Sequence, residues 1–214
     1  MPPPPPYVEP VRIGPERYTT VARWYDLLSL EWPVYRTPRL VAIAALGLRP
    51  GDTVLDVGCG TGLNLAPLHD RIGPNGRVAG IDASAHMLAV ARHKAGRHQW
   101  TRDTFLTADA TRPPDGLPTW VDAAIATYAL SLMPHWRAAL DSMLARVRPG
   151  GRVAVVDLAA PPGPVVGPLA GLACRLGGSD PAARPAEELA RRATDVVARD
   201  LRAGHVQVRV GTVQ

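Results

Sequence analysis

Residues 54–62 (VLDVGCGTG) constrain the fold of this chain more than any other segment. They have the pattern of a buried β-strand that carries an aspartate near its end and then turns through three glycines into a helix. Glycine adopts backbone angles closed to other residues and leaves space where a Cβ would meet a ligand. The helix that follows offers unpaired N–H groups and the positive end of its dipole to an anion. This order of elements predicts an α/β fold with a ligand site at the glycine turn.

The spacing of the glycines selects among the ligands that bind such turns. A dinucleotide fingerprint is G-x-G-x-x-G, whereas Gly58, Gly60 and Gly62 give G-x-G-x-G. Asp56, which lies before the first glycine, would repel a pyrophosphate and favour a cationic amine or sulfonium. Asp82, at the end of the next expected strand, is placed to hold both hydroxyls of a ribose. The pattern predicts a ribose-bearing cofactor that also carries positive charge.

Length and composition limit the class of protein. The 214 residues suit one α/β domain. The two cysteines, Cys59 and Cys174, exclude a disulfide framework, and no zinc motif is present, so we expect no metal. No apolar run reaches the ~20 residues of a membrane span, and the N-terminus lacks the pattern of a signal peptide, so we expect a cytoplasmic protein. The net charge of +5 comes from scattered arginines, which leaves transient contact with an anionic membrane surface open.

The hydrophobic pattern predicts a single domain behind a proline-rich tail. We expect residues 1–17 to be disordered and residues 18–214 to form one domain, in which residues 18–50 form a helical lid. Leu40, Val41, Ala44 and Leu46 are the expected apolar face of its second helix. From Thr53 onward strands and helices alternate, which predicts a largely parallel sheet with helices on both faces.

The predicted strands are residues 53–57, 77–81, 105–108, 121–127, 152–158 and 205–210. A seventh strand, if present, is expected near residues 160–176. Helices are predicted at residues 63–70, 85–95 and 136–147, with Ser84 as an N-cap and Pro67 shortening or kinking the first. A last helix is expected to start at Pro185 and to place Leu189, Ala193, Val196 and Val197 on one face.

Several motifs together resemble those of class I S-adenosylmethionine (SAM) methyltransferases. Residues 54–62 resemble motif I, residues 81–84 the ribose-binding end of the second strand, residues 108–110 the segment that reads adenine, and residues 145–157 the turn and strand that close the core. Tyr25 and the lid resemble the start of the ubiquinone/menaquinone methyltransferases and the bacterial phospholipid N-methyltransferases. The resemblance extends from Val21 to the C-terminus. It implies a Rossmann-like methyltransferase fold and SAM as the cofactor.

The same resemblance implies which residues hold the cofactor. Asp109 would accept a hydrogen bond from the exocyclic amine of adenine, and the Ala110 N–H would donate to the ring. The expected cofactor-binding residues are Tyr25, Asp56, Gly58, Cys59, Gly60, Thr61, Gly62, Asp82, Ala83, Met87, Asp109, Ala110 and Thr127. No catalytic residue is assigned. Tyr25, Tyr128 and His135 are the candidates, although His135 is more simply explained as a surface histidine.

The residues expected around the acceptor indicate its chemical class. Thr127 and Tyr128 follow the fourth strand, where many nucleic-acid amino-methyltransferases carry an Asn/Asp-Pro-Pro-aromatic run and metal-dependent enzymes an acid. The expected lining is apolar and aromatic: Tyr18, Tyr25, Leu28, Tyr35, Tyr128, Leu132 and Met133. We therefore expect SN2 methyl transfer to a small apolar or amphiphilic acceptor such as a quinone, lipid or secondary metabolite, and not to nucleic acid. The sequence does not indicate an oligomeric state.

Two alternatives remain at this point. One is a methyltransferase-like domain that binds SAM, or nothing, and acts through a partner without catalysis. The other is a nicotinamide-dependent oxidoreductase on a Rossmann fold. A short-chain reductase would need Tyr-x-x-x-Lys, but the one lysine, Lys94, has Val90 at the tyrosine position.

Overall fold

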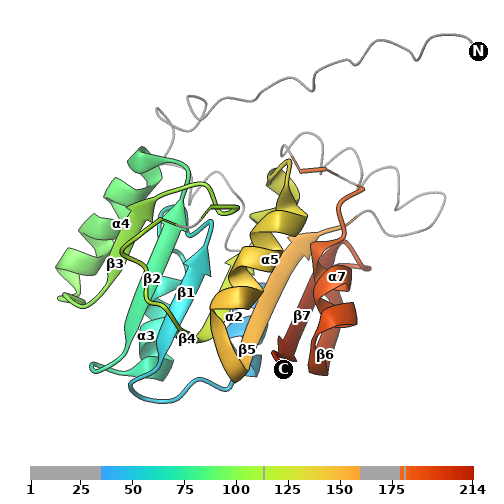
Figure 1. Cartoon of the computed structure of the whole chain (residues 1–214), viewed down its shortest axis with the longest axis horizontal. Coiled ribbons are helices and arrows are strands. Elements are labelled where there is room, and N and C mark those ends of the chain that lie inside the picture. The colour runs from blue at the N-terminus through green and yellow to red at the C-terminus, as the bar shows by residue number, and fades with distance from the viewer. Residues whose placement is uncertain (1–34, 113, 160–178, 181) are drawn as a thin grey trace, which may run out of the picture.

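The computed structural model describes residues 35–112, 114–159, 179–180 and 182–214. These residues form a seven-stranded sheet in the order β3-β2-β1-β4-β5-β7-β6 (Figure 1). The first five strands of that order are parallel, whereas β7 runs antiparallel to both of its neighbours, β5 and β6. The strands are β1 (Thr53–Val57), β2 (Arg77–Asp82), β3 (Thr104–Thr107), β4 (Val121–Thr127), β5 (Val147–Leu158), β6 (Thr194–Leu201) and β7 (Val206–Thr212).

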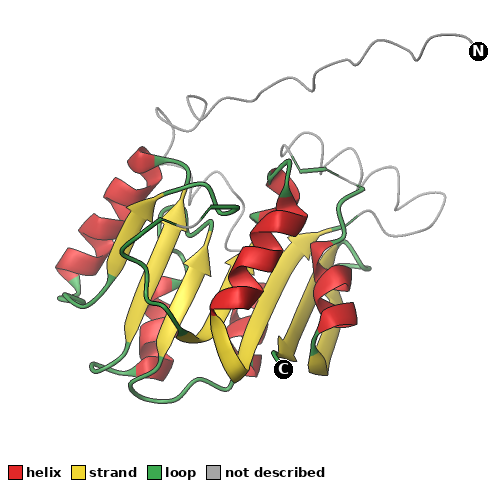
Figure 2. Cartoon of the chain, in the orientation of Figure 1, coloured by secondary structure: helices red, strands yellow, loops and turns green. Residues whose placement is uncertain are grey.

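Helices cover both faces of this sheet (Figure 2). One face packs against α2 (Arg36–Ala45), α3 (Leu65–Ile72) and α4 (Ala85–Arg97), and the other against α5 (Trp136–Arg146) and α7 (Pro185–Arg192). Alternation along β1 divides its side chains between the layers: Val54 joins the first, while Leu55 and Val57 join the second. The predicted Rossmann-like α/β fold with a largely parallel sheet is confirmed.

The strand order places a ligand site at the carboxyl ends of β1 and β4. From β1 the chain winds outward through β2 and β3 and then crosses back to β4 on the other side of β1. In open α/β sheets, ligands bind in the crevice where the strand order reverses in this way. Asp56, Thr127 and the glycine turn all lie at this edge, which is uppermost in Figure 1.

Local chemistry explains where the helices begin. The side chain of Ser84 accepts a hydrogen bond from the N–H of Met87 at 3.3 Å and caps α4, as predicted. Helix α3 begins at Leu65, not at Leu63 as predicted, with Asn64 at its N-cap. Pro67 lies in the first turn, where backbone N–H groups have no partner within the helix, so the proline removes no hydrogen bond. The helix is short, as predicted, and accommodates the proline.

The predicted apolar face of the helix around residues 40–46 is partly wrong. Helix α2 buries Pro38, Arg39, Ala42 and Ile43, whereas Ala44 is exposed. The helix packs on β5 and β7. The face that it buries differs from the predicted face and includes Arg39. The hydrophobic pattern did not predict this because it gave the buried face only to apolar residues.

The prediction of one helix from Pro185 through Val197 is wrong. Helix α7 ends at Arg192, and Ala193 is already extended, with φ −105° and ψ 159°. Thr194, Val196 and Val197 are β-branched, and they favour the strand β6 that pairs with β7. The seventh strand of the described sheet is therefore β6, and the segment near residues 160–176 lies outside the described residues.

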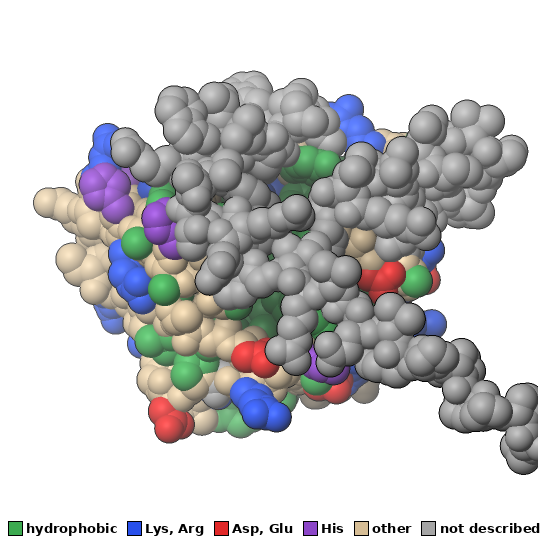
Figure 3. Space-filling model, turned by 90° about the horizontal axis from the view of Figure 1, so that it is seen from above, with side chains coloured by type: hydrophobic (Ala, Val, Ile, Leu, Met, Phe, Trp, Pro, Cys, Tyr) green, Lys and Arg blue, Asp and Glu red, His purple; other side chains and the backbone are tan. Residues whose placement is uncertain are grey.

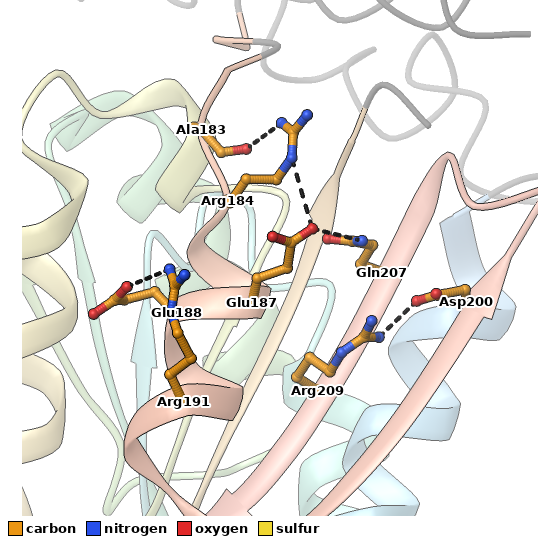
Figure 4. Close-up of polar contacts among 8 residues, drawn as sticks. All are labelled: Ala183, Arg184, Glu187, Glu188, Arg191, Asp200, Gln207 and Arg209. Carbon is orange, nitrogen blue, oxygen red and sulfur yellow. Dashed lines mark hydrogen bonds and ion pairs between the residues drawn. The ribbon is translucent and has the colours of Figure 1, made fainter. Parts of the chain in front are cut away.

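Polar contacts attach α7 to the two terminal strands. Oε1 of Glu187 in α7 lies 3.7 Å from Nε of Arg184, the N-cap residue of that helix, and accepts a hydrogen bond from Nε2 of Gln207 in β7 at 3.4 Å (Figure 4). Arg209 of β7 pairs with Asp200 of β6 at 2.6 Å. These pairs are partly exposed, so each stabilises the fold only modestly.

Some predicted features lie outside the described residues. They are the tail at residues 1–17, the first lid helix with Tyr18, Tyr25 and Leu28, and residues 160–176. The other predicted strands begin and end within two residues of their expected bounds, except that β5 already starts at Val147. Within the described part of the chain, no helix has the length and apolar character needed to cross a membrane.

Candidate cofactor site

The glycine turn after β1 contains three residues with left-handed backbone angles. Gly58, Gly60 and Gly62 have φ of 68°, 54° and 78°, which side chains other than glycine rarely adopt. A Cβ on Gly58 would lie 2.5 Å from the Cβ of Ala129, and one on Gly62 would lie 2.5 Å from Cδ1 of Leu65. Among the described residues, nothing lies within 4 Å of the position of a Cβ on Gly60. Gly58 and Gly62 are thus required by packing, while Gly60 borders open space in which a ligand can approach the backbone.

Asp82 at the end of β2 is fixed directly beside this turn. Its Oδ2 accepts a hydrogen bond from the Gly60 N–H at 2.8 Å, and its Oδ1 accepts one from the Ser84 N–H at 2.8 Å. Burial raises the pKa of this carboxyl, and the two N–H groups counteract that rise. Each carboxylate oxygen has two acceptor positions, so one on each remains for a ligand. The side chain is thus oriented before any ribose binds.

Asp56 is fully buried under the turn. Its Oδ1 accepts a hydrogen bond from Nδ2 of Asn64 at 2.9 Å. Burial raises its pKa to about 7, against the lowering effects of Asn64 and Arg39. Among the described residues its Oδ2 has no hydrogen-bond partner. An unpaired oxygen on a buried carboxylate is costly, and a cationic group placed beside it would offset the lost hydration.

A buried polar network connects α2 to this site. Nη1 of Arg39 donates to Oδ1 of Asn64 at 2.6 Å and to Oγ1 of Thr127 at 2.7 Å. Nδ2 of Asn64 also lies 3.3 Å from Oγ1 of Thr127. Three elements that are distant in the sequence, α2, the start of α3 and the end of β4, therefore meet through these side chains.

Tyr128 follows Thr127 in a strained conformation. Its φ is 55°, in the left-handed region that non-glycine residues avoid. Its hydroxyl donates to the carbonyl oxygen of Tyr35 at 2.9 Å, and the two rings are 4.9 Å apart. The guanidinium of Arg39 lies 5.6 Å from the centre of the Tyr128 ring. The start of α2 thus contacts the residues that follow β4, and strain of this kind clusters at functional sites.

The segment predicted to read adenine lies beyond β3. Oδ1 of Asp109 accepts a hydrogen bond from the Thr111 N–H at 2.9 Å, which lowers the pKa of this exposed carboxyl. Ala110 is buried. The charge of His135 also lowers the pKa of Asp109. His135 is exposed at the N-cap of α5. It is therefore close enough to Asp109 to act on its charge, and it is not one of the residues hydrogen-bonded around Thr127.

The structure brings most of the predicted cofactor residues to one edge of the sheet. Ala83 is exposed just after Asp82, while Cys59, Thr61 and Met87 are buried. Burial raises the pKa of the Cys59 thiol. A Cβ on Gly80 would lie 2.8 Å from Sγ of Cys59, so the space between these two residues admits only small side chains. Tyr25 lies outside the described residues. Of the catalytic candidates, Tyr128 is at this edge next to Thr127.

Hydrophobic side chains are visible among polar and charged ones on this face of the molecule (Figure 3). Leu132, just beyond β4, is 36% exposed there. A cavity of about 250 Å³ lies elsewhere, and its lining is Thr37, Pro38, Leu201 and Arg202. That cavity contains no predicted site residue. We therefore place the candidate site at the glycine turn, beside the carboxylates of Asp56 and Asp82.

Sequence reasoning missed two features of the site. Arg39 and Asn64 were not predicted, although an arginine inside the otherwise apolar stretch of residues 38–46 is a usable signal. The second is the buried pair of Ser131 and Asp157, in which Oδ2 of Asp157 accepts from the Ser131 N–H at 2.8 Å. Burial raises the pKa of Asp157 to about 6. This pair joins the 3-10 helix η3 (Leu130–Leu132) to the end of β5.

These residues fit a cofactor that combines a ribose with positive charge. Gly60 leaves space at the turn, Asp82 has free acceptor positions, and Asp56 has an unpaired oxygen among the described residues. Within the described ranges, no three His, Cys, Asp or Glu side chains are grouped so that they could hold a metal ion.

Comparison with known sequences places this site in a family. Residues 54–151 match the model of a methyltransferase domain. The chain is 32% identical over 160 residues to a ubiquinone/menaquinone biosynthesis C-methyltransferase of Ectopseudomonas mendocina, covering 71% of this chain and 60% of that protein. It is 36% identical over 149 residues to a demethylmenaquinone methyltransferase of Beutenbergia cavernae, covering 68% and 58%. The chain therefore spans about three fifths of the length of these relatives.

Solved structures agree with the fold. A SAM-dependent methyltransferase from Aquifex aeolicus matches with a TM-score of 0.64 at 20% identity, covering 95% of this chain and all of that one (100%). A Haloferax volcanii putative methyltransferase in complex with the Trm112 activator matches with a TM-score of 0.71 at 17% identity, covering 95% and 99%. At these identities the likeness concerns the fold alone.

The methyltransferase domain match, these relatives and the fold confirm the resemblance to class I SAM-dependent methyltransferases that the motifs predict. Within that class, the chain resembles the quinone methyltransferases named above.

Proposed function

We propose that this protein transfers a methyl group from SAM to the ring of a small quinone-type acceptor. The observation that carries the cofactor assignment is the pairing of Asp82 with the Gly60 N–H beside a turn that is open at Gly60. The acceptor class rests on relatives named for methylation of ubiquinone and menaquinone precursors and of a 2-phytyl-1,4-naphthoquinone.

The residues have distinct roles in this proposal. Asp82 would accept hydrogen bonds from the ribose hydroxyls, Asp109 and Ala110 would contact the adenine, and Asp56 would face the cationic end. When bound, SAM supplies an electrophilic methyl group on a positively charged sulfur. The protein's contribution is then alignment and exclusion of water, which supply much of the rate enhancement in such displacements. A general base is needed only if the acceptor must lose a proton before or during attack.

The described part of the acceptor side is consistent with an apolar ring. Tyr35, Tyr128, Leu132 and Met133 lie around the end of β4, and the Tyr35–Tyr128 contact gives this side a rigid aromatic wall. Aromatic side chains bind flat apolar ligands while their hydroxyls orient a polar group. We propose that the lid at residues 18–50 completes this site. The expected exclusion of nucleic acid and the cytoplasmic location stay predictions.

The test is transfer of a tritiated methyl group from SAM. The full chain is incubated with reduced naphthoquinones and benzoquinones that lack the ring methyl group, and the product is examined by mass spectrometry. We expect label on the ring carbon of one quinone class, with Asp82→Asn reducing the rate. Label on a hydroxyl oxygen, or transfer only to a phospholipid or to RNA, would contradict the acceptor class while retaining the SAM assignment.

Neither alternative has a specific observation in its favour. A nicotinamide enzyme would use the same ribose aspartate, but the buried Asp56 opposes a pyrophosphate at the turn. A non-catalytic domain would bind SAM without turnover, and the labelled transfer distinguishes this outcome directly.

A further inference from the structure

Arg39 is the charged residue that α2 places inside the protein. It is 6% exposed, and a single nitrogen, Nη1, serves both Asn64 and Thr127. Burying a guanidinium is costly unless it is hydrogen-bonded or paired, so its position must be compensated by this network. The site to which it connects is the cofactor site described above, at a distance of one side chain from Asp56.

The two contacts of Arg39 connect it to the carboxylate under the glycine turn and to the end of β4. Asn64 donates to Asp56 with its amide nitrogen while its amide oxygen accepts from Arg39, so its orientation is fixed. Thr127 ends β4 and precedes Tyr128, whose ring the same guanidinium faces. One residue of α2 therefore contacts Thr127 directly and, through Asn64, supports the carboxylate of Asp56 under the glycine turn.

We propose that Arg39 is a positioning residue of the cofactor site: it holds Asn64 and Thr127 in place, and through Asn64 it fixes the ionised carboxylate of Asp56 under the glycine turn. This inference rests on the proposed function, because the carboxylate matters for binding only if the ligand is cationic. It adds to that function a residue from outside the glycine and aspartate motifs.

The charges around Asp56 give the proposal a pH signature. Arg39 from α2 favours the ionised carboxylate, while Asp82 from β2 and burial oppose ionisation. Among the described residues, Cys59 in the glycine turn is a further titratable neighbour, and burial first and then the charge of Asp56 raise its pKa. Because the pKa of Asp56 is about 7, SAM affinity should fall as the pH decreases through this value. Without the charge of Arg39, the midpoint of that fall moves to higher pH.

The experiment is calorimetric titration of SAM into the full chain between pH 6 and pH 9. We expect Arg39→Met to raise the Kd at least tenfold at neutral pH and to shift the midpoint upward by about one unit. Arg39→Lys keeps the charge, but its nitrogen sits on a shorter side chain than Nη1 and reaches Asn64 and Thr127 less well, so it should restore the midpoint and only part of the affinity. Arg148→Met is the control, because Arg148 pairs with Asp122 at the opposite edge of the sheet. Both its Kd and its midpoint should match the wild type.

The outcomes separate this proposal from the proposed function. If the wild-type chain does not bind SAM, the cofactor assignment fails. If the wild type binds SAM and Arg39→Met has the same Kd and midpoint, only the role of Arg39 fails. A lower unfolding temperature without a shift of the midpoint would show a purely structural role and would also overturn the proposal. Should Arg39→Met not fold, Arg39→Gln takes its place: it also removes the charge, so it should raise the Kd and shift the midpoint upward, and a Kd and midpoint equal to those of the wild type would contradict the proposal.

Discussion

Gly58, Gly60 and Gly62 share a left-handed backbone but lie in different surroundings. Gly58 and Gly62 face the side chains of Ala129 and Leu65, whereas the position of a Cβ on Gly60 is empty. The same substitution therefore acts through different physical effects within one turn. Packing accounts for the outer two glycines, and the account proposed above assigns the middle one to access for the cofactor.

We expect Gly60→Ala to weaken SAM binding more than it weakens the fold. The backbone strain of an alanine at positive φ costs about 1 kcal/mol of unfolding free energy, and the new methyl group occupies space that the ligand needs. Gly58→Ala should lose about 2 kcal/mol more, because its Cβ would overlap Ala129. Urea unfolding and calorimetric titration with SAM measure the two effects.

Gly96→Ala is the matched control for these substitutions. Gly96 lies in α4, has open space around its Cβ position, and should gain stability with unchanged SAM affinity. Equal SAM affinity in Gly60→Ala and Gly96→Ala would show that the middle glycine does not border the ligand.

At the scale of elements, the link between η3 and β5 carries a titratable group. Asp157 accepts hydrogen bonds from the N–H and the hydroxyl of Ser131 and from the Leu158 N–H. Burial nevertheless raises its pKa to about 6, above the ~3.9 expected in the unfolded chain. A raised pKa in the folded state means that this group stabilises the fold below pH ~4, and that the stabilisation is lost as the pH rises through about 6.

Asp157→Asn tests this linkage. The variant should be less stable at neutral pH, because an amide cannot accept hydrogen bonds at both of its ends. The gap in unfolding free energy between wild type and variant should widen by about 1 kcal/mol from pH 7.5 to pH 5, since only the wild type takes up the proton. Urea unfolding at several pH values measures the gap. A gap that stays constant, or narrows, over this range contradicts the raised pKa.

The sequence predicts the elements well where a local pattern determines them. β1 and β4 match their expected bounds, and Ser84 caps α4, because alternating burial and capping are encoded within a few residues. The end of α7 was not predicted, because pairing of β6 with β7 overrides the helical spacing of Val196 and Val197. Arg39 was not predicted for a similar reason: its burial depends on Asn64 and Thr127, which lie 25 and 88 positions away.

The whole molecule consists of a parallel sheet that presents its carboxyl edge and an antiparallel end that closes it. Asp56, Asp82 and Thr127 come from three neighbouring parallel strands, so the sheet itself sets their spacing. β5 pairs with β7, and α2 packs on both, so the element that holds Arg39 is supported by the C-terminal strands. The site is therefore a property of the complete domain and not of the glycine motif alone.

The most direct test of the SAM site is calorimetric titration of SAM into the wild-type chain and into Asp82→Asn, with NADH as the competing ligand. The Asn variant keeps the size of the side chain but loses its charge and one acceptor oxygen beside Gly60 and Ser84. We expect one SAM per wild-type chain, an affinity at least about tenfold weaker in the variant, and no heat from NADH. Equal SAM affinity in both proteins, or NADH that binds and displaces SAM, would contradict the assignment of this site.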